Sequence, residues 1–159
     1  MTAQDLIQTL RLRAHPEGGF FAETYRAAGK TTVNGAGRSF STAIYFLLLQ
    51  GQRSRLHRLK SDELRHFYAG APLTVAQLLP GGGVERTILG PDPAAGHKFQ
   101  HAAPAGRWFG AYPEPGGEFS LAGCTVAPGF DFTDFEPADR FELLRQFPQA
   151  EELIETLTD

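Results

Sequence analysis

The stretch from Gly51 to Gly70, GQRSRLHRLKSDELRHFYAG, constrains the fold more than any other part of the chain. It places His57 and Glu63 between two glycines, with arginines interleaved. Its apolar residues are few and stand next to turn-forming residues, which is typical of short strands joined by tight turns. We therefore expect a strand around His57, a turn at residues 60–62 and a second strand from Glu63 to Tyr68.

The rest of the chain also predicts an all-β fold. Among 159 residues there are 18 glycines, 11 prolines and 13 phenylalanines, and the apolar runs are short. Further strands are expected over residues 20–26, 38–50, 73–79, 84–89, near residue 108 and over 119–126. This close spacing of strands and turns predicts a sandwich or barrel. The length fits a single domain over residues 1–159.

Helices are expected only near the two ends. Thr2 and Asp5 form a capping pattern for a helix over residues 3–12, whose apolar residues share one face. Pro137 and Pro148 are each expected to begin a helix. Residues 27–37 and 90–107 are expected to be loops, the second of them long enough to be functional at a barrel mouth.

The charge pattern argues against several classes of protein. The formal net charge is −3 and acids and bases are interspersed, so the basic surface of a nucleic-acid binder is not expected. The longest apolar run, residues 43–49, is too short to span a bilayer, and the N-terminus does not resemble a leader. We expect a soluble, cytoplasmic protein. Cys124, the single cysteine, is expected to be a small buried residue.

Several ordered motifs resemble a known family. The spacing G-x5-H-x-L-x3-E-x6-G resembles the first motif of the cupin barrels. The remaining motifs are HPEGG with ETYR, TAIYFLL, SDE, HFYAGAPL, PAGRW and APGFDFTDFE, and with them the chain resembles the small single-domain cupins of unknown function. The resemblance implies a double-stranded β-helix jelly roll, usually a homodimer, with a pocket like that of sugar-nucleotide epimerases and plant storage cupins.

The sequence departs from the metal-binding cupins at two positions. Leu59 and Phe109 stand where a metal cupin has its second and its last histidine. Only His57 and Glu63 remain as ligands, whereas stable transition-metal sites usually take three or four. We therefore favour no metal. A divalent transition metal held by His57 and Glu63, and completed by water or a loop histidine, is the alternative.

Alternation along the strands suggests which side chains meet in the barrel. His57 shares its face with Arg55, and Glu63 shares its face with Arg65. An imidazole next to a carboxylate is an acid–base couple, so His57 is the predicted base and Glu63 its orienting partner. Arg65 and Arg55 are predicted to hold an anionic ligand group. The alternative is a structural ion pair at the barrel mouth.

Other residues complete the predicted site. Glu23 and Tyr25 should share a strand face and reach the cavity together. Tyr25 or Tyr45 is the predicted acid on the far side of the ligand, and Glu23 and Phe109 are predicted to contact it. His66 should lie on the outer face.

The motifs HPEGG and PGFDFTDFE allow either a structural or a catalytic role. His15 and Glu17 could act in catalysis or only close a turn. Asp131 and Asp134 are expected to lie among packing phenylalanines, with Asp134 capping the next turn.

Three functions fit this sequence. The first is a metal-independent isomerase or epimerase acting on a polar, carbohydrate-like or anionic ligand. The second is a metal-dependent cupin enzyme with a reduced ligand set. The third is a binding or sensing module that catalyses nothing.

Overall fold

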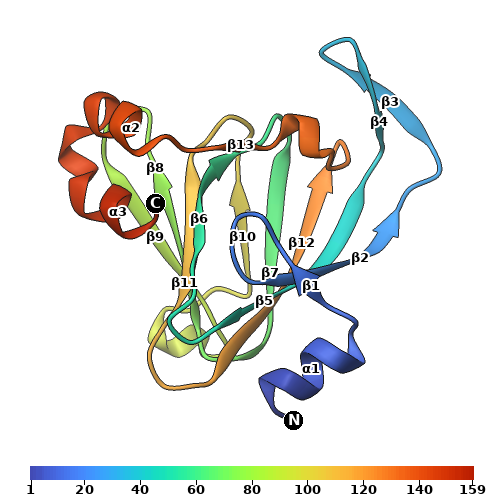
Figure 1. The fold of residues 1–159 in the computed structure, drawn as a ribbon, viewed down its shortest axis with the longest axis vertical. Helices are drawn as coiled ribbons and strands as arrows, with labels where there is room; N and C mark the ends of the chain where they lie inside the picture. The colour runs from blue at the N-terminus through green and yellow to red at the C-terminus, as the bar shows by residue number, and fades with distance from the viewer.

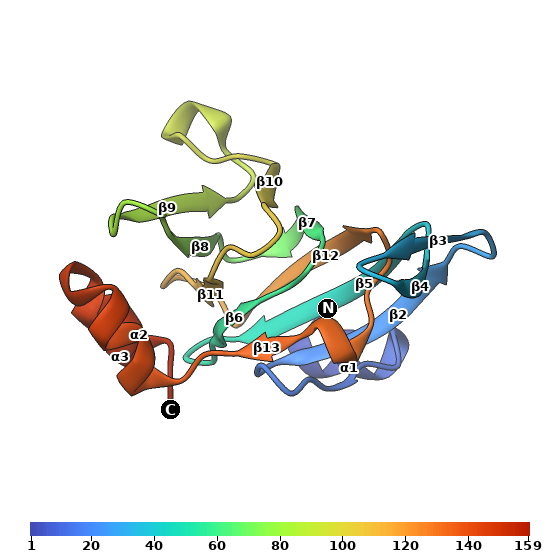
Figure 2. The ribbon, with the colours of Figure 1, turned by 90° about the horizontal axis from the view of Figure 1, so that it is seen from above.

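The computed structural model describes all residues, 1–159, and confirms the predicted jelly roll: two antiparallel sheets face each other (Figures 1 and 2). The six-stranded sheet contains, in order, β1 (Arg13–Ala14), β2 (Phe20–Arg26), β5 (Thr42–Leu49), β12 (Phe119–Ala127), β7 (Asp62–Gly70) and β10 (Gln100–Ala103). The five-stranded sheet contains β13 (Glu136–Pro137), β6 (Ser54–Arg58), β11 (Phe109–Pro113), β8 (Leu73–Leu78) and β9 (Val84–Leu89). Inward and outward side chains alternate along these strands.

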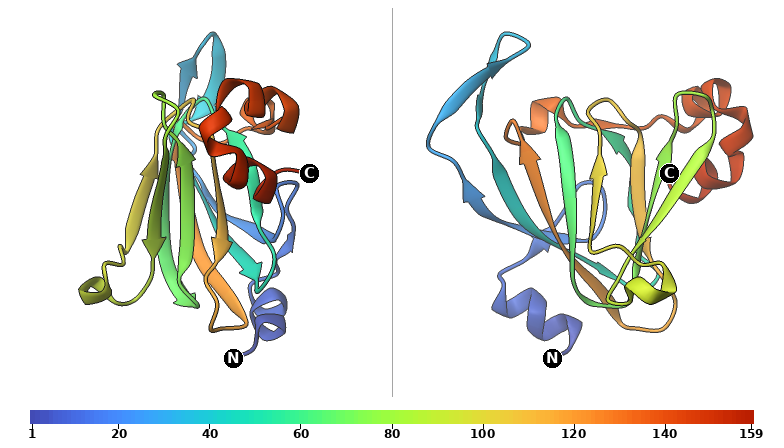
Figure 3. Two further views of the ribbon diagram at one scale, coloured as in Figure 1. Left: turned by 90° about the vertical axis from the view of Figure 1, so that its left-hand side faces the viewer. Right: turned by 180° about the vertical axis from the view of Figure 1, so that it is seen from behind.

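Three helices cover the outer faces of the sheets, as Figure 3 shows from two sides: α1 (Ala3–Thr9), α2 (Arg140–Gln146) and α3 (Glu151–Thr156). Leu6 and Ile7 of α1 pack against the six-stranded sheet around Leu47 and Leu121. Leu10 and Leu12, which follow the helix, pack in the same cluster. Helices α2 and α3 pack on the five-stranded sheet through Leu143 and Ile154. Three short 3-10 turns complete the helical structure: η1 (Pro93–Ala95), η2 (Phe132–Asp134) and η3 (Pro148–Ala150). No helix is both long and apolar enough to cross a bilayer.

Several predicted boundaries were wrong. Helix α2 begins at Arg140 because the side chain of Asp139 accepts a hydrogen bond from the backbone N–H of Glu142, and Pro137 lies in β13 instead. Residues expected to be loops contain β10 and a hairpin of β3 (Lys30–Val33) and β4 (Ala36–Ser39), which extends away from the barrel in Figure 1. These strands lack long apolar runs, so their composition gave little signal.

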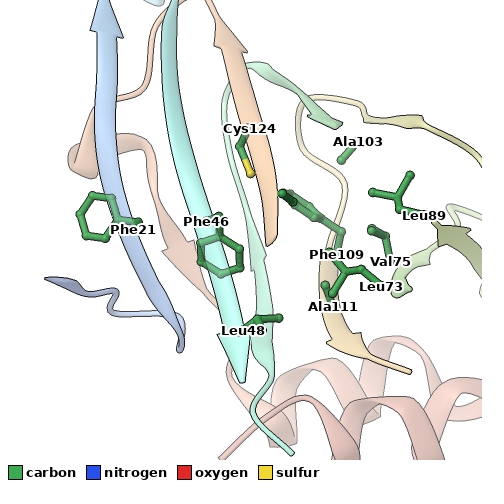
Figure 4. Close-up of a cluster of buried hydrophobic side chains, with 11 residues drawn as sticks. Phe21, Phe46, Leu48, Leu73, Val75, Leu89, Ala103, Phe109, Ala111 and Cys124 are labelled. Carbon is green, nitrogen blue, oxygen red and sulfur yellow. The ribbon is translucent and has the colours of Figure 1, made fainter. Parts of the chain in front are cut away.

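An apolar core fills part of the space between the sheets (Figure 4). Leu48, Leu73 and Val75 are each at most 1% exposed. Cys124 is 3% exposed and has no disulfide partner, as predicted. Other inward positions, polar and apolar, line a cavity.

Candidate functional site

A cavity of about 350 Å³ lies between β1, β2, β5, β6, β7 and β12, and the segment around η2 contributes part of its wall. This volume suits a small molecule. The wall combines eight hydrophobic residues with charged groups of both signs. Its lining residues are Arg13, His15, Glu17, Phe21, Glu23, Arg26, Thr42, Ile44, His57, Leu59, Glu63, Cys124, Val126, Phe130, Asp131, Phe132 and Phe135.

The HPEGG turn points Glu17 into the protein. Gly18 and Gly19 both have positive φ, at 113° and 77°, a region that favours glycine. A Cβ at Gly18 would overlap the carbonyl oxygen of Arg53, so the turn packs against the β6 side without room for a side chain. As a result the Glu17 side chain is only 6% exposed, although the turn itself connects two surface strands.

Glu17 and His57 form a buried ion pair. The Nε2 of His57 lies 3.0 Å from Oε2 of Glu17, and its Nδ1 lies 2.7 Å from the carbonyl oxygen of Arg55. Both ring nitrogens therefore face acceptors, so both must donate, and the ring is an imidazolium. Burial opposes charge on both groups, but their mutual attraction outweighs it: the pKa of His57 is raised, and the pKa of Glu17 is lowered to about 2.

Further contacts hold Glu17 and its neighbour. Its Oε1 accepts a hydrogen bond from Ser54 Oγ at 2.8 Å and lies 3.8 Å from Nη2 of Arg65. The backbone N–H of Glu17 donates to Nδ1 of His15 at 3.0 Å. Burial lowers the pKa of His15, so this ring is neutral and carries its proton on Nε2. His15 thus offers one N–H donor from the cavity wall.

Arg65 and Glu63 form a second buried pair. Nη2 and Nε of Arg65 lie 3.3 and 3.4 Å from Oε1 of Glu63. The guanidinium also lies over the rings of Phe46 and Phe109, at 5.2 and 5.7 Å. Glu63 lines the cavity, its Oε2 accepts no hydrogen bond from an N–H or O–H group of the protein, and the only other neighbour bonded to this carboxylate is the buried thiol of Cys124, a weak donor. One carboxylate oxygen is therefore left for a ligand.

Strand register explains why these groups meet. In the six-stranded sheet, Cys124 pairs with Arg65, which pairs with His101 of β10. In the five-stranded sheet, His57 pairs with Phe109, which pairs with Gln77. The row in each sheet lies at the same level of the barrel, and the two rows meet where Gln77 Nε2 lies 2.6 Å from Nε2 of His101. Polar residues far apart in the sequence are therefore neighbours.

Five of the predicted site residues come together. His57, Glu63 and Glu23 line the cavity. Arg65 lies immediately behind Glu63, and the ring of Phe109 lies 4.3 Å from the ring of His57. The carboxylate that hydrogen-bonds to His57 is nevertheless Glu17, which the sequence left between two roles, rather than Glu63.

Two tyrosines lie outside the cavity. Tyr25 is 56% exposed, because the register between β2 and β5 shifts between Glu23 and Tyr25 and breaks the expected alternation. Tyr45 has the opposite orientation to Ile44 of the cavity wall, and its ring lies 6.1 Å from that of Tyr68 on the outer face. The expectation that Glu23 and Tyr25 share a face was wrong.

Arg55 also lies elsewhere. The register between β6 and β11 shifts between Ser54 and His57, so these two residues both reach Glu17 while Arg55 turns away. Its guanidinium donates to the carbonyl of Pro16 and lies 3.4 Å from a carboxylate oxygen of Asp159. The prediction that Arg55 shares the face of His57 was wrong.

The segment 130–135 covers one side of the cavity. Phe130, Phe132 and Phe135 line it, and the ring of Phe135 stacks 5.1 Å from that of His57. Asp131 caps η2 by accepting from the backbone N–H of Thr133. Asp134 does not cap a helix as expected.

Instead Asp134 binds Arg38 of β4 through two hydrogen bonds of 2.8 Å.

Among the other histidines, His66 lies 3.2 Å from Thr125 and stacks on Tyr68, on the outer face as predicted.

Arg13 is a charged lining residue that sequence reasoning missed, and Arg26 is another. Arg13, His15 and Glu17 occupy alternate positions and all line the cavity. This alternation of polar side chains around the short strand β1 was the signal in the sequence that could have identified Arg13. The strand has only two residues, too few to stand out as a strand in the sequence.

The residues at the cupin metal positions do not fit a metal centre. Leu59 and Phe109 offer no donor atoms, both nitrogens of His57 have hydrogen-bond partners, and the positive charge next to Glu63 is the Arg65 guanidinium. No group of three or more His, Cys, Asp or Glu side chains is arranged to hold a metal ion.

Comparisons with known proteins agree with the architecture. A hypothetical protein from Leishmania major has a TM-score of 0.94 and 34% identity, covering 99% of both chains. Protein SO0799 from Shewanella oneidensis has a TM-score of 0.91 and 39% identity, covering 100% of this chain and 98% of that one. Bacillus subtilis oxalate decarboxylase, at 14% identity and a TM-score of 0.57 over 91% of this chain and 36% of that one, shares the fold alone.

Sequence comparison gives the family. The uncharacterized protein YML079W of Saccharomyces cerevisiae is 30% identical in an alignment 145 positions long that covers 82% of this chain and 72% of the yeast protein. Residues 4–138 match the family described as Cupin superfamily (DUF985). The chain therefore belongs to this family of the cupin superfamily.

Proposed function

We propose that the cavity binds a small polar, carbohydrate-like ligand and isomerises it by moving a proton next to a carbonyl group. The observation that carries the proposal is the carboxylate of Glu63, which Arg65 binds through Oε1 alone and which lies in the cavity wall next to the buried Glu17–His57 pair. A carboxylate fixed by an arginine and left with one open oxygen is positioned to accept a proton from a bound ligand.

Each group then has one task. Glu63 removes a proton from a carbon next to the carbonyl, and the C–H electron pair becomes the enolate. The N–H of His15 donates to the carbonyl oxygen, and the charged ring of His57 stabilises the negative charge that develops. The proton of the hydroxyl on the deprotonated carbon passes to the former carbonyl oxygen, and Glu63 returns its proton to the former carbonyl carbon, so that the new carbonyl forms on the neighbouring carbon. Thus one base suffices for an aldose–ketose shift.

This assignment revises the roles proposed from the sequence. His57 does not serve as the base here, because both of its nitrogens already donate hydrogen bonds. Epimerisation needs an acid on the opposite face of the ligand. The tyrosines considered for that task, Tyr25 and Tyr45, are absent from the cavity wall. Isomerisation is therefore the better-supported reaction.

Solvent deuterium exchange tests the proposal even while the product of the reaction is unidentified. Pentoses, hexoses and their acids and phosphates are incubated with the protein in D₂O and followed by NMR. We expect deuterium at the carbon next to the carbonyl of at least one sugar. In Glu63→Gln the exchange should fall at least about 100-fold while binding persists.

The control is Glu118→Gln, which removes the same charge from an exposed surface residue and should exchange like the wild type. Unchanged exchange in Glu63→Gln would rule out the assigned base. A sugar that binds without any exchange in the wild-type protein would instead identify a binding module.

We further propose that the protein is cytoplasmic and that it is a homodimer, the second of which its family resemblance implies. Exposed aromatic side chains such as Tyr68 and Phe99, at 51% and 56%, would support a contact between copies. Sedimentation velocity at micromolar concentration tests this, and a monomer there would contradict it.

A further inference from the structure

The negative side chains of the cavity wall all have partners within the protein. Glu17 pairs with His57, and Glu63 pairs with Arg65. The carboxylate of Glu23 lies 2.6 Å from Nη2 of Arg26. Asp131 accepts hydrogen bonds from the backbone and hydroxyl of Thr133. Because His57, Arg65 and Arg26 are already paired with these carboxylates, little of their positive charge is available to a ligand.

Arg13 is the exception among the charged lining residues. Its side chain makes no hydrogen bond and no ion pair, although it lines the cavity. The guanidinium instead lies over the ring of Phe21, 5.1 Å from the ring centroid. The β1–β2 register places the two residues directly opposite each other, so this contact follows from the strand pairing. Stacking on a ring leaves the N–H groups at the edge of the guanidinium free to bind an anion.

His15 provides a second donor next to Arg13. The two residues are two positions apart and on the same face, about 7 Å along an extended chain. The Nε2–H of His15 has no partner in the protein, because its Nδ1 accepts from the backbone of Glu17. Arg13 therefore suits a charged group, and the neutral His15 suits an uncharged oxygen.

We propose that Arg13 is the anion anchor of the cavity, so that the ligand is a sugar carrying a carboxylate or phosphate group at one end. This inference rests on the proposed function for the identity of the reacting end. The anionic group binds Arg13, the carbonyl oxygen accepts from His15, and the carbon next to it faces Glu63. Arg13 would then determine specificity while taking no part in proton transfer.

Calorimetric titration with three probes tests the anchor: glucuronate, glucose 6-phosphate and uncharged glucose. We expect one or both anions to bind wild-type protein at least about 10-fold more tightly than glucose, since a hydrogen bond to a charged group is stronger than one between neutral groups. Comparing the two anions distinguishes a carboxylate ligand from a phosphate ligand. In Arg13→Gln the affinity for the preferred anion should fall about 10- to 100-fold, toward that for glucose.

The matched control is Arg86→Gln, which removes the same charge from an exposed residue of β9 outside the cavity and should bind as the wild type does. Three results would overturn the anchor: anion preference that persists in Arg13→Gln, glucose binding as tightly as both anions, or no binding of either anion by the wild type at about 10 mM.

The failure of the anchor can be told from failure of the proposed isomerase. Binding is measured without turnover, and Glu63→Gln should keep the anion preference of the wild type. Loss of preference in Arg13→Gln with no deuterium exchange in any variant would support the anchor and reject the isomerase. Exchange that depends on Glu63, together with an anion preference that persists in Arg13→Gln, would do the reverse.

Discussion

The two ends of the barrel interior use the same inward positions for different purposes. At one end Leu48, Leu73, Val75 and Ala111 pack together, each at most 1% exposed (Figure 4). At the other end Glu17, His57, Glu63 and Arg65 are 2–6% exposed, so four charges are buried almost as deeply as the leucines. Burying apolar area stabilises the fold directly, whereas burying charge costs free energy unless each ion is paired.

The comparison teaches where function resides in this fold. An apolar end would be sufficient for stability, and replacing buried ion pairs by apolar side chains is often neutral or stabilising. Two acids paired with two bases, next to a cavity, therefore indicate a role in binding or chemistry.

Glu17→Gln, at the polar end of the barrel, should lower the free energy of unfolding the most. The variant leaves the imidazolium of His57 without its counter-charge, in a site that is 2% exposed. We expect a loss of about 3–5 kcal/mol in the free energy of unfolding, measured by urea denaturation. Glu118→Gln, an exposed control, should change stability by less than about 0.5 kcal/mol. A loss below about 1 kcal/mol in Glu17→Gln would show that the pair is not buried as described.

Leu73→Ala, at the apolar end of the barrel, should lower the free energy of unfolding by a smaller amount. The leucine is 1% exposed, so its truncation leaves a cavity and should cost about 3 kcal/mol of unfolding free energy. Ile88→Ala on the neighbouring strand removes a side chain that is 37% exposed and should cost less. Binding of the preferred anionic probe should change less than twofold, because Leu73 does not line the ligand cavity. Loss of binding in Leu73→Ala with little loss of stability would contradict the separation of the two ends.

The pH dependence of stability sharpens the comparison at the polar end. Because the pKa of Glu17 is lowered from 4.5 to about 2 in the folded protein, its contribution is present above pH 4.5 and is lost as the pH falls toward 2. The contribution of His57 to stability depends on pH in the opposite direction. Because the pKa of His57 is raised, this residue stabilises the folded protein below pH 6.5, and the stabilisation is lost as the pH rises through its folded-state pKa.

Between pH 5 and pH 3 the wild type should lose about 2 kcal/mol more stability than Glu17→Gln does, as measured by urea denaturation at each pH. Parallel pH profiles for the two proteins would mean that Glu17 is not the acid-sensitive group.

A surface pair provides the smallest expected effect. Arg58 and Glu136 are as close as 2.7 Å but their side chains are 39% and 54% exposed. Glu136→Gln should therefore cost less than about 1 kcal/mol of unfolding free energy in the same denaturation experiment. A cost as large as that of Glu17→Gln would mean that burial does not explain the difference between the two pairs.

The sequence predicted the fold better than the site. Motif spacing and strand alternation placed His57 and Glu63 inside a jelly roll, because both signals are local. Tyr25 and Arg55 were misplaced because register shifts between paired strands reverse the side-chain orientation, and such shifts depend on the partner strand. The pairing of Glu17 with His57 depends on a turn that packs against β6, a contact between distant segments.

Imidazole ¹⁵N NMR of His57 tests the central claim most directly, with Glu17→Gln used to assign the signals. The account predicts that both ring nitrogens are protonated at pH 6.5 and stay so to higher pH in the wild type than in Glu17→Gln. A neutral ring with one unprotonated nitrogen at pH 6.5 would contradict it, because the buried ion pair that organises the cavity would then be absent.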